Sequence, residues 1–144
     1  MLRLRWWRTG PVLRDERGQA AVELALILPV ALLLVVGSLE FARVWNVYQV
    51  VTDAAREGAR KAVVASPARS ADSVRAVVRS ALARASLDTT QAQITVSGVG
   101  DATGTPARVE IRYSYPLKML KPLMGWGSEG KTLTLAASCV MRNE

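Results

Sequence analysis

The fold of this chain is decided by residues 14–60, which read RDERGQAAVELALILPVALLLVVGSLEFARVWNVYQVVTDAAREGAR. The stretch begins with mixed charge and becomes apolar at Gln19, with one acidic residue, Glu23, inside the apolar run. No charged residue occurs from Leu24 to Leu39, and an amphipathic pattern then follows Glu40. We predict a single long helix, half in a bilayer and half outside it.

The membrane segment is predicted at residues 19–40. The run from Gln19 to Leu39 would be roughly 30 Å long at about 1.5 Å per residue, which matches the hydrocarbon thickness of a bilayer. Five arginines precede it, and a basic flank of this kind favours a cytoplasmic N-terminus; they are Arg3, Arg5, Arg8, Arg14 and Arg17. We therefore expect a single-pass membrane protein with a basic cytoplasmic leader at residues 1–18 and an extracytoplasmic domain at residues 41–144, exposed at the cell surface if it is assembled into a fibre.

A cleaved secretory signal is the competing interpretation of the same N-terminal pattern. The apolar run is longer than a usual signal h-region, and no small-x-small cleavage site follows it cleanly; the nearest approach is at residues 36–38. Pro29 lies inside the predicted span, where it removes one backbone hydrogen bond and frees the carbonyl of Ala25. It therefore predicts a helix kink, although membrane helices also tolerate prolines without one.

The composition argues against several classes of function. The chain has no histidine and one cysteine, so a metal centre, a cofactor site or a histidine-based hydrolase is not expected. The acidic residues beyond the span are scattered, and we expect neither an enzyme nor a small-molecule substrate. The net charge is +7, but removal of the leader would leave +4. Because no aromatic interleaving or recognition motif accompanies that charge, nucleic-acid binding is not expected.

The outer part predicts a pilin-like α+β domain. The long helix should run to about Val64 and a second helix from Ser70 or Asp72 to Ala85, with Pro67 breaking the pattern between them. Apolar residues then alternate in three stretches near residues 92–96, 107–115 and 131–141, which predicts a three-stranded antiparallel sheet. The inward side chains of the third strand should be Leu133, Leu135, Ala137, Cys139 and Met141. A buried, unpaired Cys139 is favoured over an intermolecular disulfide.

Two helix surfaces have simple interpretations. The small residues at 54–55 and 58–59 let another element approach closely, and packing on the chain's own domain is favoured over contact with another subunit. Glu57 and Lys61 are spaced for an i,i+4 ion pair. Arg75, Arg79 and Arg84 lie away from the apolar stripe of the second helix and are expected in solvent, with contact to acidic partners or lipid headgroups as the alternative.

The segment from residue 116 to 130 is apolar for a loop. It contains Leu117, Met119, Leu120, Leu123, Met124 and Trp126. These side chains are expected either to complete the core under the sheet or to form an exposed patch for a partner or the bilayer surface.

The segment from Gly18 to Glu23 contains a candidate cleavage site and a carboxylate at the start of the apolar run. A small residue ends the basic leader, and a carboxylate follows five residues later at the start of the apolar run. An ionised side chain in hydrocarbon costs on the order of 3 kcal/mol, so Glu23 should have a partner. Cutting after Gly18 would supply one, because the new amino group of Gln19 lies one helical turn away. The same pair could instead form between subunits and fix their axial register.

Gly18 and Gln19 with Glu23 resemble the cleavage site of type IV prepilins and pseudopilins. The longer stretch, with its early proline and its closing A-A-R-x-G-A-R, is similar to the TadE-like family, the pseudopilins of tight-adherence (Flp-type) pilus systems. The resemblance implies cleavage after Gly18 by a membrane-embedded prepilin peptidase. It also implies partners among pilin and pseudopilin subunits and the inner-membrane assembly platform.

Two departures favour a minor pseudopilin over the major fibre subunit. Major pilins of this system carry Glu-Tyr where this chain has Glu23-Leu24, and they lack a large outer domain. The competing function is an uncleaved, single-pass anchored protein whose outer domain binds a partner or ligand. In that case Gly18 is incidental, and Glu23 pairs with a neighbouring helix or reaches the interface.

Overall fold

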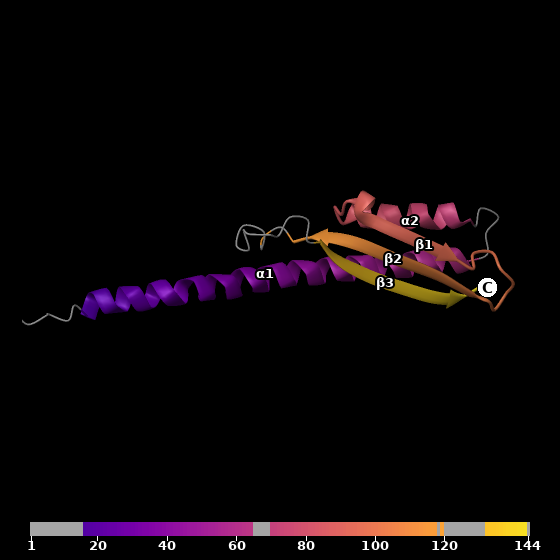
Figure 1. The fold of residues 1–144 in the computed structure, drawn as a ribbon. Coiled ribbons are helices and arrows are strands. Elements are labelled where there is room, and N and C mark those ends of the chain that lie inside the picture. Colours follow the sequence, from indigo (N-terminus) through magenta and orange to yellow (C-terminus); the bar gives the residue numbers. More distant parts are fainter. Residues whose placement is uncertain (1–15, 65–69, 118, 120–131, 144) are drawn as a thin grey trace, which may run out of the picture. The chain divides into compact units, whose positions relative to one another are not determined.

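The structure is a computed structural model in which residues 16–64, 70–117, 119 and 132–143 are described. The chain divides into two compact units, Met1–Val35 and Val36–Glu144. The elements follow in the order α1 (Glu16–Val63), α2 (Ala71–Arg84), the 3-10 turn η1 (Thr89–Gln91), β1 (Ala92–Ser97), β2 (Pro106–Pro116) and β3 (Thr132–Arg142) (Figure 1). The predicted α+β arrangement of a long helix, a second helix and a three-stranded sheet is confirmed.

Helix α1 has 48 residues and begins three residues before the predicted start at Gln19. In its first part the large apolar side chains are exposed, with Leu26 at 70% and Leu34 at 66%. The most hydropathic window of the helix has a mean hydropathy of 2.5, and none of it is buried. The described residues thus contain one helix long and apolar enough to cross a membrane.

Helix α2 is capped at both ends by its own sequence. The hydroxyl of Ser70 accepts from the Ser73 amide, and the Ser73 hydroxyl accepts from the Ser70 amide, each at 3.2 Å. This reciprocal capping box satisfies two amides that the helix cannot, and it confirms Ser70 as the N-cap. At the other end Ser86 adopts φ 59°, and Leu87 N–H donates to Leu82 C=O at 3.0 Å. That pairing closes the last turn as a Schellman motif.

The sheet has the order β1-β2-β3 with antiparallel neighbours. On β2 the residues that face the helices are buried and those between them are more exposed, as the alternating pattern predicts. The inward set of β3 is only partly correct. Leu135 and Ala137 are buried, Cys139 and Met141 are half-buried, and Leu133 is 42% exposed. Alternation decides the side of the sheet on which a residue lies, whereas burial also needs an element above it, and Leu133 lies on an edge strand near the end of the sheet. Cys139 is a free thiol packed against the core.

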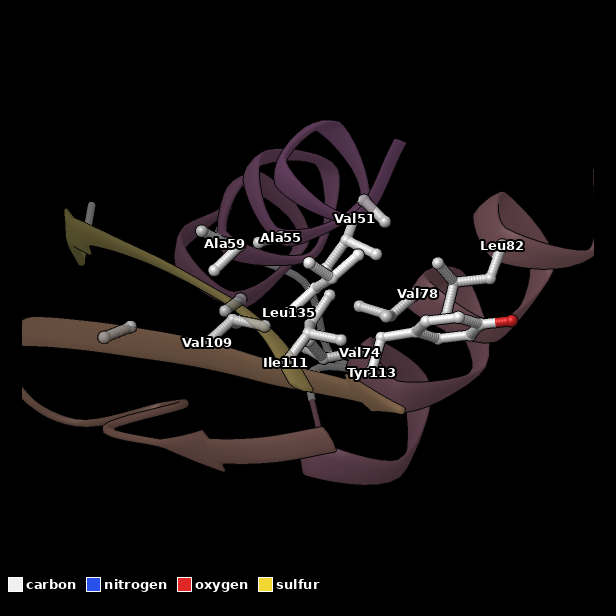
Figure 2. Close-up of a cluster of buried hydrophobic side chains, with 14 of the residues drawn as sticks. Val51, Ala55, Ala59, Val74, Val78, Leu82, Val109, Ile111, Tyr113 and Leu135 are labelled. Carbon is white, nitrogen blue, oxygen red and sulfur yellow. The ribbon is translucent and has the colours of Figure 1, made fainter. Parts of the chain in front are cut away.

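Both helices contribute to one core on the same face of the sheet (Figure 2). Val51 of α1, Leu82 of α2 and Ile111 of β2 are all 0% exposed. A Cβ placed on Gly58 would lie 2.6 Å from Cγ2 of Val78, so α1 and α2 approach more closely there than any side chain would allow. The buried Ala54, Ala55 and Ala59 flank this contact. The small-residue surface therefore packs on the chain's own domain, as expected.

Candidate functional site

The predicted processing site lies in the first turns of α1. The helix begins at Glu16, so Gly18 and Gln19 both have helical backbone, and both side-chain positions are exposed. The first amides of a helix have no intrahelical acceptor, and glycine favours the helix less than alanine by about 1 kcal/mol. The segment around Gly18 is therefore among the less stable parts of α1.

Glu23 lies one turn further along α1 and is exposed among exposed apolar neighbours. Val22 and Leu24 beside it are each 62% exposed. Within the described part of the chain, no hydrogen bond or ion pair joins its carboxylate to another residue. The Glu23 carboxylate is thus exposed on an otherwise apolar surface of the helix. Helix α1 continues through Pro29, and a kink there stays a prediction.

A second carboxylate, Glu40, was not singled out by the sequence, yet it is among the most buried groups of the domain. It is 2% exposed, and one of its oxygens accepts a hydrogen bond from the backbone amide of Met119 at 3.2 Å. The hydroxyl of Tyr115 also hydrogen-bonds to it. Glu40 therefore connects the start of the outer half of α1 to the end of β2 and the segment beyond it.

The helical spacing of the sequence could have predicted that Glu40 is buried. Val44 and Val47 follow it at i+4 and i+7, and Val47 is buried in the core. Extending the apolar face of α1 backwards by one turn therefore arrives at Glu40. In the sequence alone, Glu40 has the position of the charged end of the span, because a charge after a long apolar run is normally in solvent.

Partial burial of Tyr115 raises its pKa above the usual value of 10.0. Burial is the largest cause, followed by the negative charge and hydrogen bond of Glu40, whereas Arg43 acts in the opposite direction. Because the folded-state pKa is raised, the stabilising effect is complete below about pH 10 and is lost as the pH rises through the folded-state pKa.

We expect Glu40→Gln to lower the pKa of Tyr115 towards its usual value, since the carboxamide carries no charge to oppose the phenolate. Ring-carbon NMR of the tyrosines across an alkaline titration would measure the change. Tyr115→Phe serves as the control, because it removes the resonance and identifies it. A Tyr115 titration that is identical in the parent protein and in Glu40→Gln would show that the two groups are not coupled.

An open groove lies beside this carboxylate, within the second unit. It is lined from α1, the turn after α2 and the neighbouring strand ends by Leu39, Ala42, Arg43, Asn46, Val47, Ser86, Leu87, Asp88, Gln91, Tyr113, Tyr115, Pro116 and Thr132. Most of the lining is apolar, with the guanidinium of Arg43 and the carboxylate of Asp88 as its charges. The Asp88 carboxylate accepts from the hydroxyl and amide of Thr90, and the hydroxyl bond is the main reason that its pKa is lowered.

Further along the domain, α1 and α2 are joined by an ion pair that the sequence did not predict. Arg84 donates to both carboxylate oxygens of Glu57, at 2.9 and 3.1 Å. Glu57 was expected to pair with Lys61, and Arg84 was expected to be solvated. Both bonds come from one nitrogen, Nη2, of the Arg84 guanidinium, which the packing of α2 on α1 brings to the Glu57 carboxylate. Both side chains remain about half exposed, so the pair contributes little to stability.

The apolar segment after β2 is only partly described. Leu117 and Met119 are half-buried, and the Met119 amide is the donor to Glu40. The other predicted members of the patch, Leu120, Leu123, Met124 and Trp126, lie outside the described residues. Among the residues that the structure describes, no group of three or more histidine, cysteine, aspartate or glutamate side chains could hold a metal ion.

These features define a class of protein. One N-terminal apolar helix suggests single-pass membrane anchoring, and a compact α+β unit follows it. Residues 18–60 match the family model described as TadE-like protein, which confirms the resemblance drawn from the sequence. The match begins at Gly18 and ends within α1, so it covers less than a third of the chain. It shows that this segment of α1 is similar to TadE-like proteins. Comparisons with curated proteins and with solved structures give no match.

Proposed function

We propose that this protein is a minor pilin-like subunit of a tight-adherence pilus or of its assembly platform. The leader at residues 1–18 is cytoplasmic and is removed by a prepilin peptidase that cuts between Gly18 and Gln19. Residues 19–40 span the membrane, and the domain at 41–144 lies outside it. The partners are the lipid bilayer, the peptidase, other pilin and pseudopilin subunits, and the platform in the inner membrane.

The observation that carries this proposal is the Glu23 carboxylate, exposed on an apolar helix surface without a partner in the described part of the chain. In hydrocarbon such a group costs on the order of 3 kcal/mol, and the cost falls when a cation is within reach. Cleavage after Gly18 places the amino group of Gln19 at i−4 from Glu23, which is close on a helix. A carboxylate near the new helix N-terminus also interacts favourably with the helix dipole.

The register function follows from the same energetics. If the amino group of Gln19 in one subunit meets Glu23 of its neighbour, only one axial alignment of the two helices neutralises both charges. Every other alignment leaves a carboxylate in lipid, so the misaligned states are disfavoured by about the same 3 kcal/mol. The folded domain of the second unit, which a short major pilin lacks, supports a minor subunit that makes specific contacts outside the membrane.

One observation favours a second function. The open groove beside Glu40 has apolar walls and two charged side chains, which suits a ligand or a peptide of a secreted partner. An uncleaved, membrane-anchored binding protein would use this groove and would not need Gly18. In that protein Glu23 would pair with a neighbouring helix in the membrane.

The N-terminus of the protein extracted from native membranes distinguishes these functions. We expect intact-mass and peptide mass spectrometry to find a start at Gln19, with the terminal glutamine free, cyclised or methylated. A protein that begins at Met1 would favour the anchored binding protein, because no new amino group would exist. A start near Ser38 would identify a secretory signal and would contradict both proposals.

A further inference from the structure

Three aromatic side chains form a continuous exposed ladder on α1 just beyond the charge-free run. Phe41 and Trp45 are stacked with ring centroids 6.3 Å apart, and Trp45 and Tyr48 lie 6.0 Å apart. The steps of four and three residues place the rings along one stripe of the helix. Their exposed fractions are 68%, 54% and 38%, so the described part of the domain leaves the outer face of the ladder uncovered.

The ladder has the position and the chemistry of a membrane interface. It starts two residues after Leu39, where the charge-free run ends, and at about 1.5 Å per residue it extends roughly 10 Å along the helix. Aromatic rings with an apolar body and a polar tip are favoured at the level of the lipid headgroups. The polarity of the three side chains also increases in the direction away from the apolar run, since the apolar Phe41 comes first and the phenol of Tyr48 comes last.

The nearest carboxylate does not oppose burial of the ladder in lipid. Glu40 precedes Phe41 directly, but it is 2% exposed and accepts from the Met119 amide within the domain. Phe41 is turned outward at the same level of the helix. Among the described residues, burial of Glu40 thus leaves no carboxylate on this stripe of α1, and the exposed Leu39 precedes it on the helix.

We propose that Phe41, Trp45 and Tyr48 lie in the headgroup layer of the outer leaflet and fix the depth of the chain in the bilayer. This inference depends on membrane anchoring, but not on cleavage after Gly18 or on incorporation into a pilus. A negative result would therefore leave the proposed pilus function untouched, and the N-terminal analysis would leave this inference untouched. Continuity with the apolar run favours lipid over a second protein as the partner.

Depth-dependent quenching of tryptophan fluorescence tests the proposal. The full chain would be reconstituted in phosphatidylcholine vesicles with Trp6, Trp7 and Trp126 replaced by phenylalanine, so that Trp45 is the only tryptophan and can be excited selectively. Lipids brominated near the headgroup end of the acyl chain should quench Trp45 about twice as strongly as lipids brominated near the chain end, as expected for an interfacial indole. Aqueous iodide should quench it weakly.

A matched control moves the indole by one position. In the same background, Trp45→Phe with Asn46→Trp places the ring about 100° around the helix, on the side that lines the groove. We expect this ring to be quenched less by brominated lipid. Equal quenching at positions 45 and 46 would overturn the claim that one stripe contacts lipid. Strong iodide quenching of Trp45 would place it in water, and protection from both quenchers would indicate a protein partner; either result would also overturn the proposal.

Discussion

Replacement of Glu23 by leucine is expected to stop incorporation of the protein into pilus structures while leaving its membrane insertion intact. Removal of a charge makes the apolar run more favourable in lipid, so the anchored amount should be unchanged or higher. The substitution removes the energetic penalty on misaligned subunits, which is about 3 kcal/mol. This energy corresponds to a roughly hundredfold preference for the correct register. Fractionation of membranes and sheared pili, followed by immunoblotting, would measure both quantities.

A displaced charge is the sharpest control for this prediction. Ile27→Glu in the Glu23→Leu background restores one carboxylate, one turn further along the same face of α1. If position matters, the displaced carboxylate should not restore incorporation, because it no longer meets the amino group of Gln19. Glu23→Asp should retain part of the function. Normal incorporation of Glu23→Leu would show that the carboxylate does not set the register.

The second large effect is expected at Gly58, where α1 meets α2. Gly58→Leu should destabilise the domain by more than about 3 kcal/mol, because the new side chain would occupy the position of Val78 in a filled core. Its first added atom alone would lie 2.6 Å from Cγ2 of Val78, which is 0% exposed and part of the core. Chemical unfolding of the full chain in detergent, followed by near-ultraviolet circular dichroism, would measure the loss.

Gly37 provides the matched control on the same helix. A Cβ at Gly37 has nothing within 4 Å, so Gly37→Leu should leave the free energy of unfolding unchanged or slightly higher. The smaller change Gly58→Ala should be partly compensated by Val78→Ala, since the cavity of one accommodates the methyl group of the other. If the two single substitutions were simply additive, or if Gly58→Leu were tolerated, the close approach of α1 and α2 would be wrong.

Regular periodicity was the part of the fold that could be predicted from the sequence. The capping serine at position 70, the two-residue alternation along β2 and the long charge-free run each act through neighbouring residues. The predicted helices and strands therefore agree with the structure to within a few residues. The resemblance to TadE-like proteins was also a local property, because it rests on a continuous segment of α1.

Contacts between distant residues were not predictable in this way. The sequence indicated Glu40 as the charged end of a span, but in the structure this carboxylate is 2% exposed and hydrogen-bonds to Tyr115 and Met119. Likewise, Glu57 pairs with Arg84, 27 residues away, instead of the lysine one turn along. Leu133 lies on the predicted side of the sheet, opposite Tyr115, yet it is 42% exposed on an edge strand.

By itself the sequence determined the apolar helix, the candidate cleavage segment around Gly18, the position of Glu23 and the order of helices and strands. These depend on the spacing of charge and apolar side chains along one chain, and spacing is fixed by covalent connectivity. Only the tertiary structure decided which charge is buried and which aromatic face stays exposed. Burial depends on what packs over a residue: Glu40 is 2% exposed and accepts from Met119, 79 residues further along the chain, whereas Phe41 beside it is 68% exposed.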